Sequence, residues 1–298
     1  MNKKAKKYYN SDTTLDIVLT IILSIIGIVV AYPLVNVLAS SFSSSEAVLG
    51  GRVWLWPVEF NIEGYKAVFR TNDVLIGYAN SLLYTVVGTC INIVMTLLAA
   101  YPLSRKDMPG QGFFSLMFTF TMIFSGGMIP NYILIRDLGF LNTIWAMVIP
   151  GAITVHNMII TRTFIVNSIP KEMLEAAKID GADDIQYFFK MVLPLSGSVI
   201  AVITLYYAVA HWNAYLNAFM YLSEKKRYPL QIFLRDILIS NKVEADMLLD
   251  EFGNMASQSL GDLLKYSLII VAMVPVLLIY PLVQKHFVKG VMVGAVKG

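Results

Sequence analysis

Polar and aromatic side chains gather in one apolar stretch of this sequence, between Met191 and Ser223. The group consists of Tyr206, Tyr207, His211, Trp212, Asn213, Tyr215 and Asn217. Hydroxyl and amide groups can hydrogen-bond a polar solute, and aromatic rings can stack against its faces. The group could therefore line a path for such a solute, or it could supply hydrogen bonds between neighbouring helices.

Enzymatic chemistry has no comparable support in the sequence. The three histidines, His156, His211 and His286, have no spacing to a carboxylate or to each other that is typical of a metal site. The one cysteine, Cys90, cannot form an intrachain disulfide. Because the sequence contains neither a phosphate-binding loop of the form G-x-x-x-x-G-K-[ST] nor a nucleophile–base pair, we expect no catalysis, no metal and no cofactor bound by this chain.

The composition indicates a membrane protein. Only 14% of the 298 residues are charged, whereas a soluble domain carries about 25%. The apolar fraction is 57%, and the mean hydropathy is +0.64. These values exclude a disordered chain, a disulfide-rich scaffold and an ordinary soluble enzyme. The formal net charge of +3 is too small to suggest nucleic-acid binding.

The charged residues are absent from six long windows, each able to hold a helix of about 20 residues that crosses the hydrocarbon core. The windows are 17–45, 74–104, 108–135, 138–161, 191–223 and 266–284. We therefore predict an all-α polytopic membrane protein whose transmembrane domain occupies residues 15–285. The six predicted spans are about 15–38, 78–102, 113–135, 142–161, 194–222 and 266–284.

The first window predicts a retained span. Its apolar run, from Leu15 to Leu38, is longer than the 7–15 residues of a signal-peptide core. Four lysines precede it within residues 3–7, and basic residues mark the cytoplasmic side of a span. We therefore expect residues 1–14 and 286–298 to be cytoplasmic, so that both termini lie on the same side.

Two long segments are then external. Residues 39–73 contain Trp54 and Trp56, which suit the membrane interface. Residues 223–265 contain an amphipathic pattern with helical spacing, formed by Leu230, Phe233, Leu234 and Ile237. The pattern predicts either a helix lying on the protein or membrane surface, or a docking surface for an external partner.

The largest predicted cytoplasmic loop, residues 162–194, contains residues that start and end helices in the order expected of a helix–turn–helix. Pro170 fits the first turn of a helix, and Gly181 can take the left-handed conformation that ends it. Asp183 and Asp184 suit the start of a second short helix, and Pro194 is expected to begin the fifth span. The loop could be a folded connector or a knob that inserts into a partner.

The motif in this loop resembles the EAA loop of ABC-importer permeases. That pattern reads E-A-A, three residues, G, nine residues, I-x-L-P. The chain has Glu175-Ala176-Ala177, then Gly181, then Met191-Val192-Leu193-Pro194, and departs only in having Met191 in place of Ile. Further similarity to the carbohydrate-uptake branch lies at Pro130, Leu138-Gly139, Leu141-Asn142-Thr143, Trp212-Asn213 and Gly294–Gly298. Within that branch the chain is similar to the second permease of oligosaccharide importers, the class of the smaller maltose-transporter permease.

This resemblance implies a MetI-like six-helix bundle with a cytoplasmic coupling helix, located in the bacterial cell membrane. The chain would form half of a pore with a second permease and would work with two ATPase subunits and an extracellular solute-binding protein. ATP and Mg would be bound by the ATPases, and the substrate would be a carbohydrate, with membrane lipid around the bundle. Alternating access would follow from ATP-driven movement of the coupling loop.

The resemblance also assigns roles to particular residues. Those implied in ATPase coupling are Glu175, Ala176, Ala177, Asp180, Gly181, Leu193 and Pro194. The tail residues implied to reach toward the ATPase dimer are Gly294, Lys297 and Gly298. Candidates for the substrate pathway are Tyr207, Trp212, Asn213, Tyr215 and Asn217, with interhelical hydrogen bonding as the alternative role of each.

Two other functions are considered. An ABC importer for a non-sugar solute, such as an amino acid or a peptide, would share the EAA loop. An ion-coupled secondary transporter would carry carboxylates within its spans, but the sequence has only Asp16 at the edge of the first. The identity of the sugar and of the partner subunits does not follow from the sequence.

Overall fold

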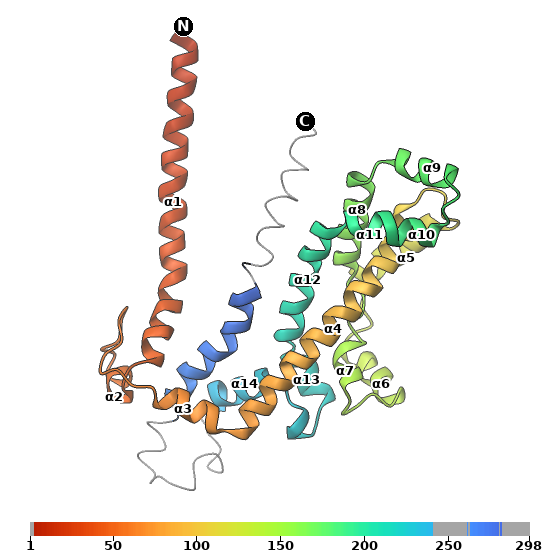
Figure 1. The fold of residues 1–298 in the computed structure, drawn as a ribbon. Helices are drawn as coiled ribbons and strands as arrows, with labels where there is room; N and C mark the ends of the chain where they lie inside the picture. The colour runs from red at the N-terminus through yellow and green to blue at the C-terminus, as the bar shows by residue number, and fades with distance from the viewer. Residues whose placement is uncertain (1–2, 241–260, 262, 280, 282–298) are drawn as a thin grey trace. The chain divides into compact units, whose positions relative to one another are not determined.

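The computed structural model describes residues 3–240, 261, 263–279 and 281. In these residues the regular structure is entirely helical. The chain divides into two compact units, residues 1–71 with 236–271 and residues 72–235 with 272–298. Figure 1 shows the elements of both units.

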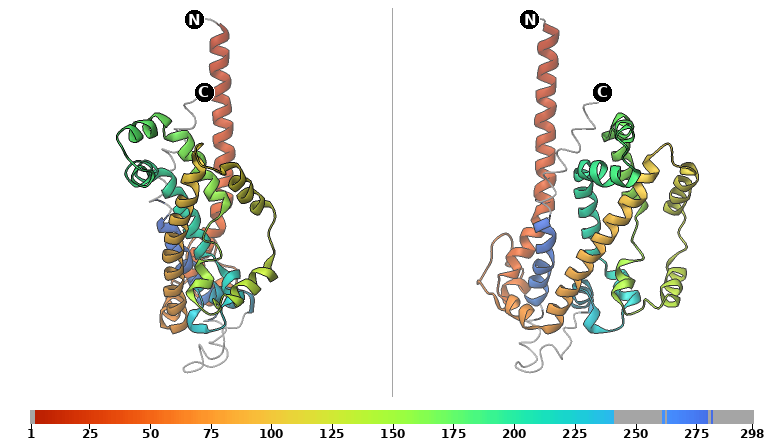
Figure 2. Two further views of the ribbon diagram at one scale, coloured as in Figure 1. Left: turned by 90° about the vertical axis from the view of Figure 1, so that its right-hand side faces the viewer. Right: turned by 45° about the vertical axis from the view of Figure 1, so that its right-hand side comes forward.

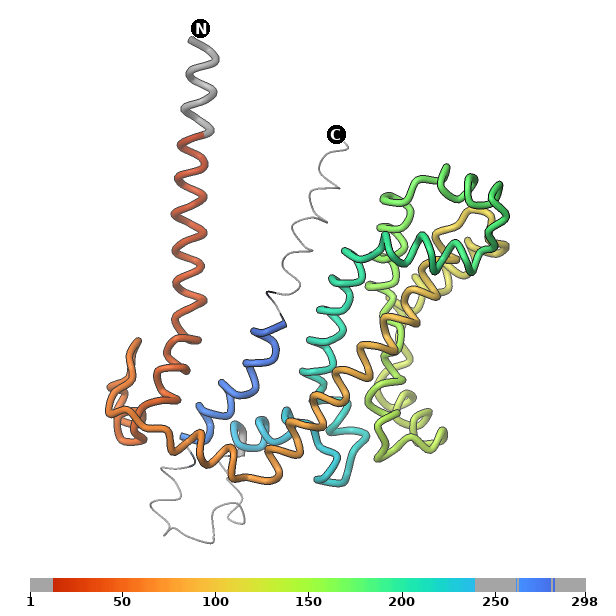
Figure 3. The backbone as a smooth tube through the Cα atoms, in the orientation of Figure 1, coloured from red at the N-terminus to blue at the C-terminus, as the bar shows by residue number. Residues whose placement is uncertain are grey.

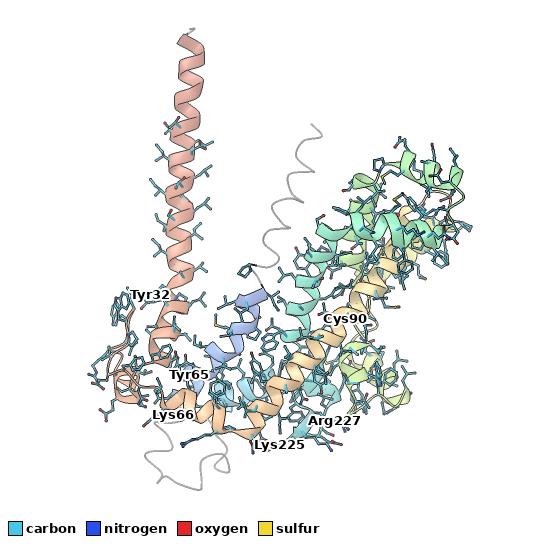
Figure 4. The ribbon with its side chains drawn as sticks, in the orientation of Figure 1. Tyr32, Tyr65, Lys66, Cys90, Lys225 and Arg227 are labelled. Atoms are coloured by element: carbon cyan, nitrogen blue, oxygen red, sulfur yellow. The ribbon has the colours of Figure 1, made fainter. Side chains whose placement is uncertain are left out.

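The first unit is built around α1 (Lys3–Ser41), α2 (Ser45–Leu49) and α3 (Glu63–Arg70). From Thr13 onward α1 is long and apolar enough to cross a membrane, and its side chains are mostly exposed, as expected for a helix surrounded by lipid. Hydrogen bonds hold the segment that follows α1 against the C-terminal end of that helix. The Asn36 amide donates to the carbonyl oxygens of Val53 and Trp54, both at 3.0 Å. The Ser41 hydroxyl lies 2.8 Å from that of Tyr65, which is labelled in Figure 4.

The second unit is organised by α4 (Asn72–Ser104), against which α12 (Gly197–Trp212) and α8 (Val155–Ser168) pack. Its smaller helices are α5 (Gln111–Ile123), α6 (Met128–Asp137), α7 (Ile144–Val148) and α13 (Tyr215–Tyr221). Buried polar groups join the packed helices, as they do in membrane bundles. Figure 2 shows α6, α7 and α13 gathered at one end of α4 and α12.

Two α4 glycines permit close packing. A side chain at Gly77 would meet the ring of Phe233, and one at Gly88 would overlap the His211 ring. His211 Nε2 lies 2.7 Å from Asn92 Oδ1, and the Asn92 amide donates to the Gly151 carbonyl oxygen. The α4 backbone therefore approaches Phe233 at Gly77 and α12 at Gly88 as closely as it does because glycine has no side chain.

The six predicted spans are only partly reproduced as continuous helices. Over the described residues, Thr13–Ser41 and Asn72–Ser104 are long and apolar enough to cross a membrane, and two bent helix pairs raise the number to four. One bent pair joins α5 and α6 at 114°, and the other joins Asp184–Leu195 and Gly197–Trp212 at 77°. A shorter apolar helix, Leu263–Ile279, overlaps most of the predicted sixth span.

Three predicted spans contain a break that apolar composition did not reveal. The span at 113–135 breaks before α6 at Gly127, whose φ of +88° favours glycine. The span at 142–161 becomes two helices, α7 and α8, separated by Pro150 and Gly151, which interrupt helices. The span at 194–222 breaks between α12 and α13 at Asn213.

The helix expected to begin at Pro194 begins three residues later in the structure. Pro194 belongs to the short helix α11 (Leu193–Leu195), and α12 begins at Gly197 after a sharp turn, which the tube in Figure 3 follows. At this turn Ser196 is fully buried, and its hydroxyl donates to the Val192 carbonyl oxygen at 2.7 Å. The Val192 carbonyl oxygen therefore accepts two bonds from Ser196, one from the hydroxyl and one from the backbone amide at 3.0 Å.

The predicted external segment 223–265 contains the expected helix in its described part. It begins with a short turn, η2 (Lys225–Arg227), and continues as α14 (Leu230–Ser240). The Asn80 amide donates to the Lys226 carbonyl oxygen at 2.9 Å, and the Tyr84 hydroxyl donates to that of Arg227 at 2.8 Å. These bonds anchor the start of the segment, labelled at Lys225 and Arg227 in Figure 4, to α4.

Candidate functional site

The loop that carries the EAA-like motif folds as a helical hairpin. Its helices are α9 (Lys171–Ile179), α10 (Asp184–Tyr187) and a π-helical turn, η1 (Phe188–Val192), followed by α11. Pro170 caps α9 one position before its first turn. In the views of Figure 2 the hairpin lies at the opposite end of α4 and α12 from α6, α7 and α13.

Gly181 makes the turn of the hairpin as the spacing predicts. Its φ is +78°, in the left-handed region that glycine adopts at low cost. The Gly181 amide donates to the Lys178 carbonyl at 3.1 Å, and the Ala182 amide donates to that of Ala177 at 2.9 Å. This pair of bonds is the Schellman arrangement that ends a helix. The Asp183 carboxylate then accepts a hydrogen bond from the backbone amide of Gln186 at 2.6 Å and caps α10.

The second half of the hairpin divides its apolar residues between two sides. Phe188 and Val192 are buried, whereas Ile185 and Phe189 are exposed. The sequence predicts one apolar face for all four, but Ile185 on α10 and Phe189 in the π-helical turn are exposed. With Ile179, which is 86% exposed, they are among the exposed apolar residues of the hairpin.

The motif residues are distributed on both sides of the hairpin. Glu175, Ala176, Asp180, Gly181 and Pro194 are exposed, and Leu193 is half-buried. Ala177 instead packs inward, against the cluster that contains Tyr101, Tyr187 and Phe188. Its small side chain lets α9 approach this cluster.

Arg105 ties the hairpin to the end of α4, a role that the sequence analysis missed. Its guanidinium donates to the Asp107 carboxylate (Nε to Oδ1, 2.8 Å), to the Tyr101 hydroxyl at 3.0 Å and to Asp184 of α10. Lys178 of α9 also donates to Asp107 at 3.0 Å. We call Tyr101, Arg105, Asp107, Lys178 and Asp184 the Arg105 network.

The charges of this network are mutually stabilised. The Arg105 guanidinium holds the pKa of Asp107 well below its usual range, and Lys178 acts in the same direction. The bond to Asp107 likewise raises the pKa of Arg105. Only 11% of the Arg105 side chain is exposed, so solvent screens its ion pairs less than those of an ordinary surface residue.

The predicted pathway residues fall into two groups. Tyr207 and Trp212 are buried and hydrogen-bonded within the chain. The Tyr207 hydroxyl lies 2.7 Å from Thr96 Oγ1 and accepts from the Thr154 amide at 3.1 Å, and Trp212 Nε1 donates to the Ala272 carbonyl at 3.0 Å. Their environment therefore favours the interhelical role. Asn213 is exposed, and Tyr215 and Asn217 are half-buried.

Two further expectations concern the C-terminal tail and metal binding. The tail residues Gly294, Lys297 and Gly298 lie outside the described residues. Across the part of the chain that is described, no group of three or more His, Cys, Asp or Glu side chains could hold a metal ion.

Comparison with known proteins identifies the family. The family described as "Binding-protein-dependent transport system inner membrane component" matches residues 74–293. The chain belongs to this permease family. Its members are transport components, not enzymes. The predicted family and the MetI-like, all-helical fold are confirmed.

Relatives match this permease over nearly their whole length. The polygalacturonan/rhamnogalacturonan transport system permease protein YtcP of Bacillus subtilis is 41% identical over 273 residues, covering 91% of this chain and 94% of the relative. Protein LplC of the same organism is 37% identical, covering 92% and 91%. A crystal structure of a bacterial ABC transporter that imports the acidic polysaccharide alginate contains a similar chain, with a TM-score of 0.85 and 33% identity, covering 93% of this permease and 98% of that chain.

Proposed function

We propose that this permease is one half of the pore of an ATP-driven oligosaccharide importer in the bacterial cytoplasmic membrane. The observation that carries the proposal is that relatives matching the permease over nine-tenths of its length, YtcP and the alginate importer chain, are named for polysaccharide transport. A second permease supplies the other half of the pore. An external solute-binding protein delivers the carbohydrate.

The cytoplasmic hairpin is the proposed contact with two ATPase subunits, which bind ATP and Mg. Its exposed apolar residues suit a groove on the ATPase, because burying Ile179, Ile185 and Phe189 removes apolar surface from water. Glu175 and Asp180 add negative charge to the hairpin and can pair with basic groups. Ala176 permits close approach.

Movement of the hairpin is proposed to reach the spans by two routes. The Arg105 network links α9 and α10 to α4, and the chain passes directly through α11 into α12. When the ATPases close on ATP, the hairpin moves and tilts these helices so that the pore opens outward. Hydrolysis returns the pore to its inward-open state.

The proposed topology has six spans with both termini in the cytoplasm. The bent pairs and the α7–α8 pair each count as one span, because non-helical backbone at membrane depth is tolerated where it is buried in protein or lines a cavity. The C-terminal tail would lie on the ATPase side. Asn213, Tyr215 and Asn217 would face the sugar pathway, with Tyr207 and Trp212 supporting it from behind.

Substitution of Gly181 tests the coupling role. In the complex with its second permease, ATPases and binding protein, Gly181→Val should lower the amount of oligosaccharide taken up per ATP, because a β-branched residue at φ +78° is strained by at least about 1–2 kcal/mol. Gly181→Asn is the matched control, since asparagine tolerates this conformation and should retain most of the coupling. Uptake into proteoliposomes and phosphate release are measured together.

Two results would count against the proposal in different ways. If Gly181→Val coupled as well as the unaltered complex, the hairpin would not be the coupling element. If the unaltered complex took up no oligosaccharide with ATP, the transport function itself would be wrong.

A further inference from the structure

The fifth proposed span is interrupted at a point where the chain is exposed. Helix α12 ends at Trp212, and α13 begins at Tyr215 after a tight turn in which the Tyr215 amide donates to the Asn213 carbonyl at 2.7 Å. The Asn213 side chain is exposed. A polar amide beside irregular backbone is unsuited to lipid, so this break is expected to face a water-filled cavity in the assembled importer.

A cation and two aromatic rings lie next to the break. The Cζ atom of Arg235 is 5.5 Å from the ring centroid of Tyr215 and 5.4 Å from that of Phe219. The two rings are 5.8 Å apart. Gln231, one turn before Arg235 on α14, approaches Asn213 with its amide nitrogen 3.4 Å from Oδ1. We call Asn213, Tyr215, Phe219, Gln231 and Arg235 the Arg235 cluster.

This combination of groups has the chemistry needed to hold an acidic sugar. Aromatic faces stack against the C–H surface of a pyranose ring, and side-chain amides hydrogen-bond its hydroxyls. A guanidinium presents a planar set of N–H donors that matches the two oxygens of a carboxylate, while its face can remain stacked on an aromatic ring. Phe219 is 57% exposed, which leaves ring surface at the edge of the cluster.

We propose that the Arg235 cluster is a subsite for a uronate unit of an acidic oligosaccharide. The inference rests on the proposed importer function and adds the charge of the substrate and the residues that recognise it. Arg235 pairs with the uronate carboxylate, Tyr215 stacks on the sugar ring, and Asn213 and Gln231 bind hydroxyls. The names of two relatives agree with this charge, since polygalacturonan is built of uronate and alginate is described as acidic.

Initial rates of uptake test the proposal in the reconstituted complex of the full chain with its second permease, ATPases and binding protein. The probes are trigalacturonate and the neutral galactotriose. Arg235→Gln should lower trigalacturonate uptake by about tenfold or more, the loss of one charge-assisted hydrogen bond. The trigalacturonate uptake rate of Arg235→Lys should lie between those of Arg235→Gln and the unaltered complex, because an ammonium group cannot bind a carboxylate in the bidentate manner.

Lys226→Gln is the matched control for charge. It removes one positive charge from the same external segment, where the Lys226 side chain is 71% exposed and paired with Glu224 at 3.0 Å. It should leave trigalacturonate uptake within about twofold, because exposed ion pairs contribute little. Tyr215→Leu should lower uptake and Tyr215→Phe should retain it, since stacking needs the ring and not the hydroxyl.

The outcomes separate the subsite from the transport function. If Arg235→Gln and Lys226→Gln lowered uptake equally, or if the unaltered complex imported galactotriose but not trigalacturonate, the uronate subsite would be wrong and the importer function would stand. If the unaltered complex imported neither probe, both proposals would be overturned. Should Arg235→Gln fail to co-purify with its partners, the Arg235→Lys and Tyr215→Leu rates decide the question.

Discussion

Arg105 is the residue through which a small displacement of the hairpin can reach a long membrane helix. It follows α4 directly, and its guanidinium contacts both the loop after α4 and the start of α10. Because most of the side chain is buried, the three bonds hold it in one orientation. In the proposed mechanism this network passes the movement of α10 to α4, which a flexible surface pair would not do.

We predict that Arg105→Gln weakens coupling without preventing assembly. Removal of the charge leaves Asp107 and Asp184 without their common partner, so uptake per ATP should fall by about threefold to tenfold, as expected for one partly buried ion-pair network. Arg136→Gln is the control, because Arg136 pairs with Asp137 at 2.9 Å with 55% of its side chain exposed. Equal ratios of uptake to phosphate release in the two variants would contradict the proposed role.

The same network predicts how coupling depends on pH. A carboxylate whose pKa is lowered in the folded state stabilises that state above its usual pKa, and the contribution is lost only as pH falls through the lowered value. Since the pKa of Asp107 lies well below its usual range, lowering the pH from about 7.5 to about 5.5 should leave Asp107 ionised. The fall in uptake per ATP caused by Arg105→Gln should therefore be the same at both pH values.

At the scale of elements, sequence reasoning succeeded where one residue type determines the local structure. Gly181 could be assigned to a left-handed turn, and Asp183 to the start of α10, because the physical reason is contained in each residue and its neighbours. The hairpin was therefore predicted correctly, together with the family it identifies.

Features that depend on packing could not be predicted in this way. The exposure of Ile185 and Phe189 depends on which side of the hairpin packs inward, and it is Phe188 and Val192 that pack against residues of α4 and α8. The Arg105 network joins residues 79 positions apart, and the Arg235 cluster joins α13 to α14. Counts of charged and apolar residues contain no information on contacts between residues that are distant in the sequence, because these contacts follow from the tertiary arrangement.

The packing of α4 on α12 gives a prediction at this scale. In Gly88→Ala the added methyl group overlaps the His211 ring, so the ring must move and its contact with Asn92 is lost. The expected destabilisation is about 1–3 kcal/mol, as for other overpacked cores, and it is measured as a lower melting temperature of the purified complex. Gly112→Ala on α5 is the control, because nothing lies within 4 Å of the added atom. An unchanged melting temperature in Gly88→Ala would show that the helices are not packed as closely as described.

At the scale of the whole molecule, the few charged residues indicate how the chain is oriented in the membrane. The lysines at residues 3–7 and the basic residues of the hairpin and of the Arg105 network all fall in segments assigned to the cytoplasm. The ATPase-binding hairpin must lie on that side in the proposed importer, since ATP is cytoplasmic. The charge distribution and the coupling mechanism therefore require the same orientation, although each is argued from different residues.

This orientation predicts which positions an impermeant thiol reagent reaches in intact cells. The chain has one cysteine, so Cys90→Ser gives a background free of thiols. In that background Trp56→Cys, at an exposed position in the external segment, should react in intact cells. Lys106→Cys, exposed beside Arg105, should react only after the membrane is permeabilised. The opposite pattern would place the hairpin outside the cell, where no ATPase could reach it, and would contradict both the orientation and the coupling mechanism.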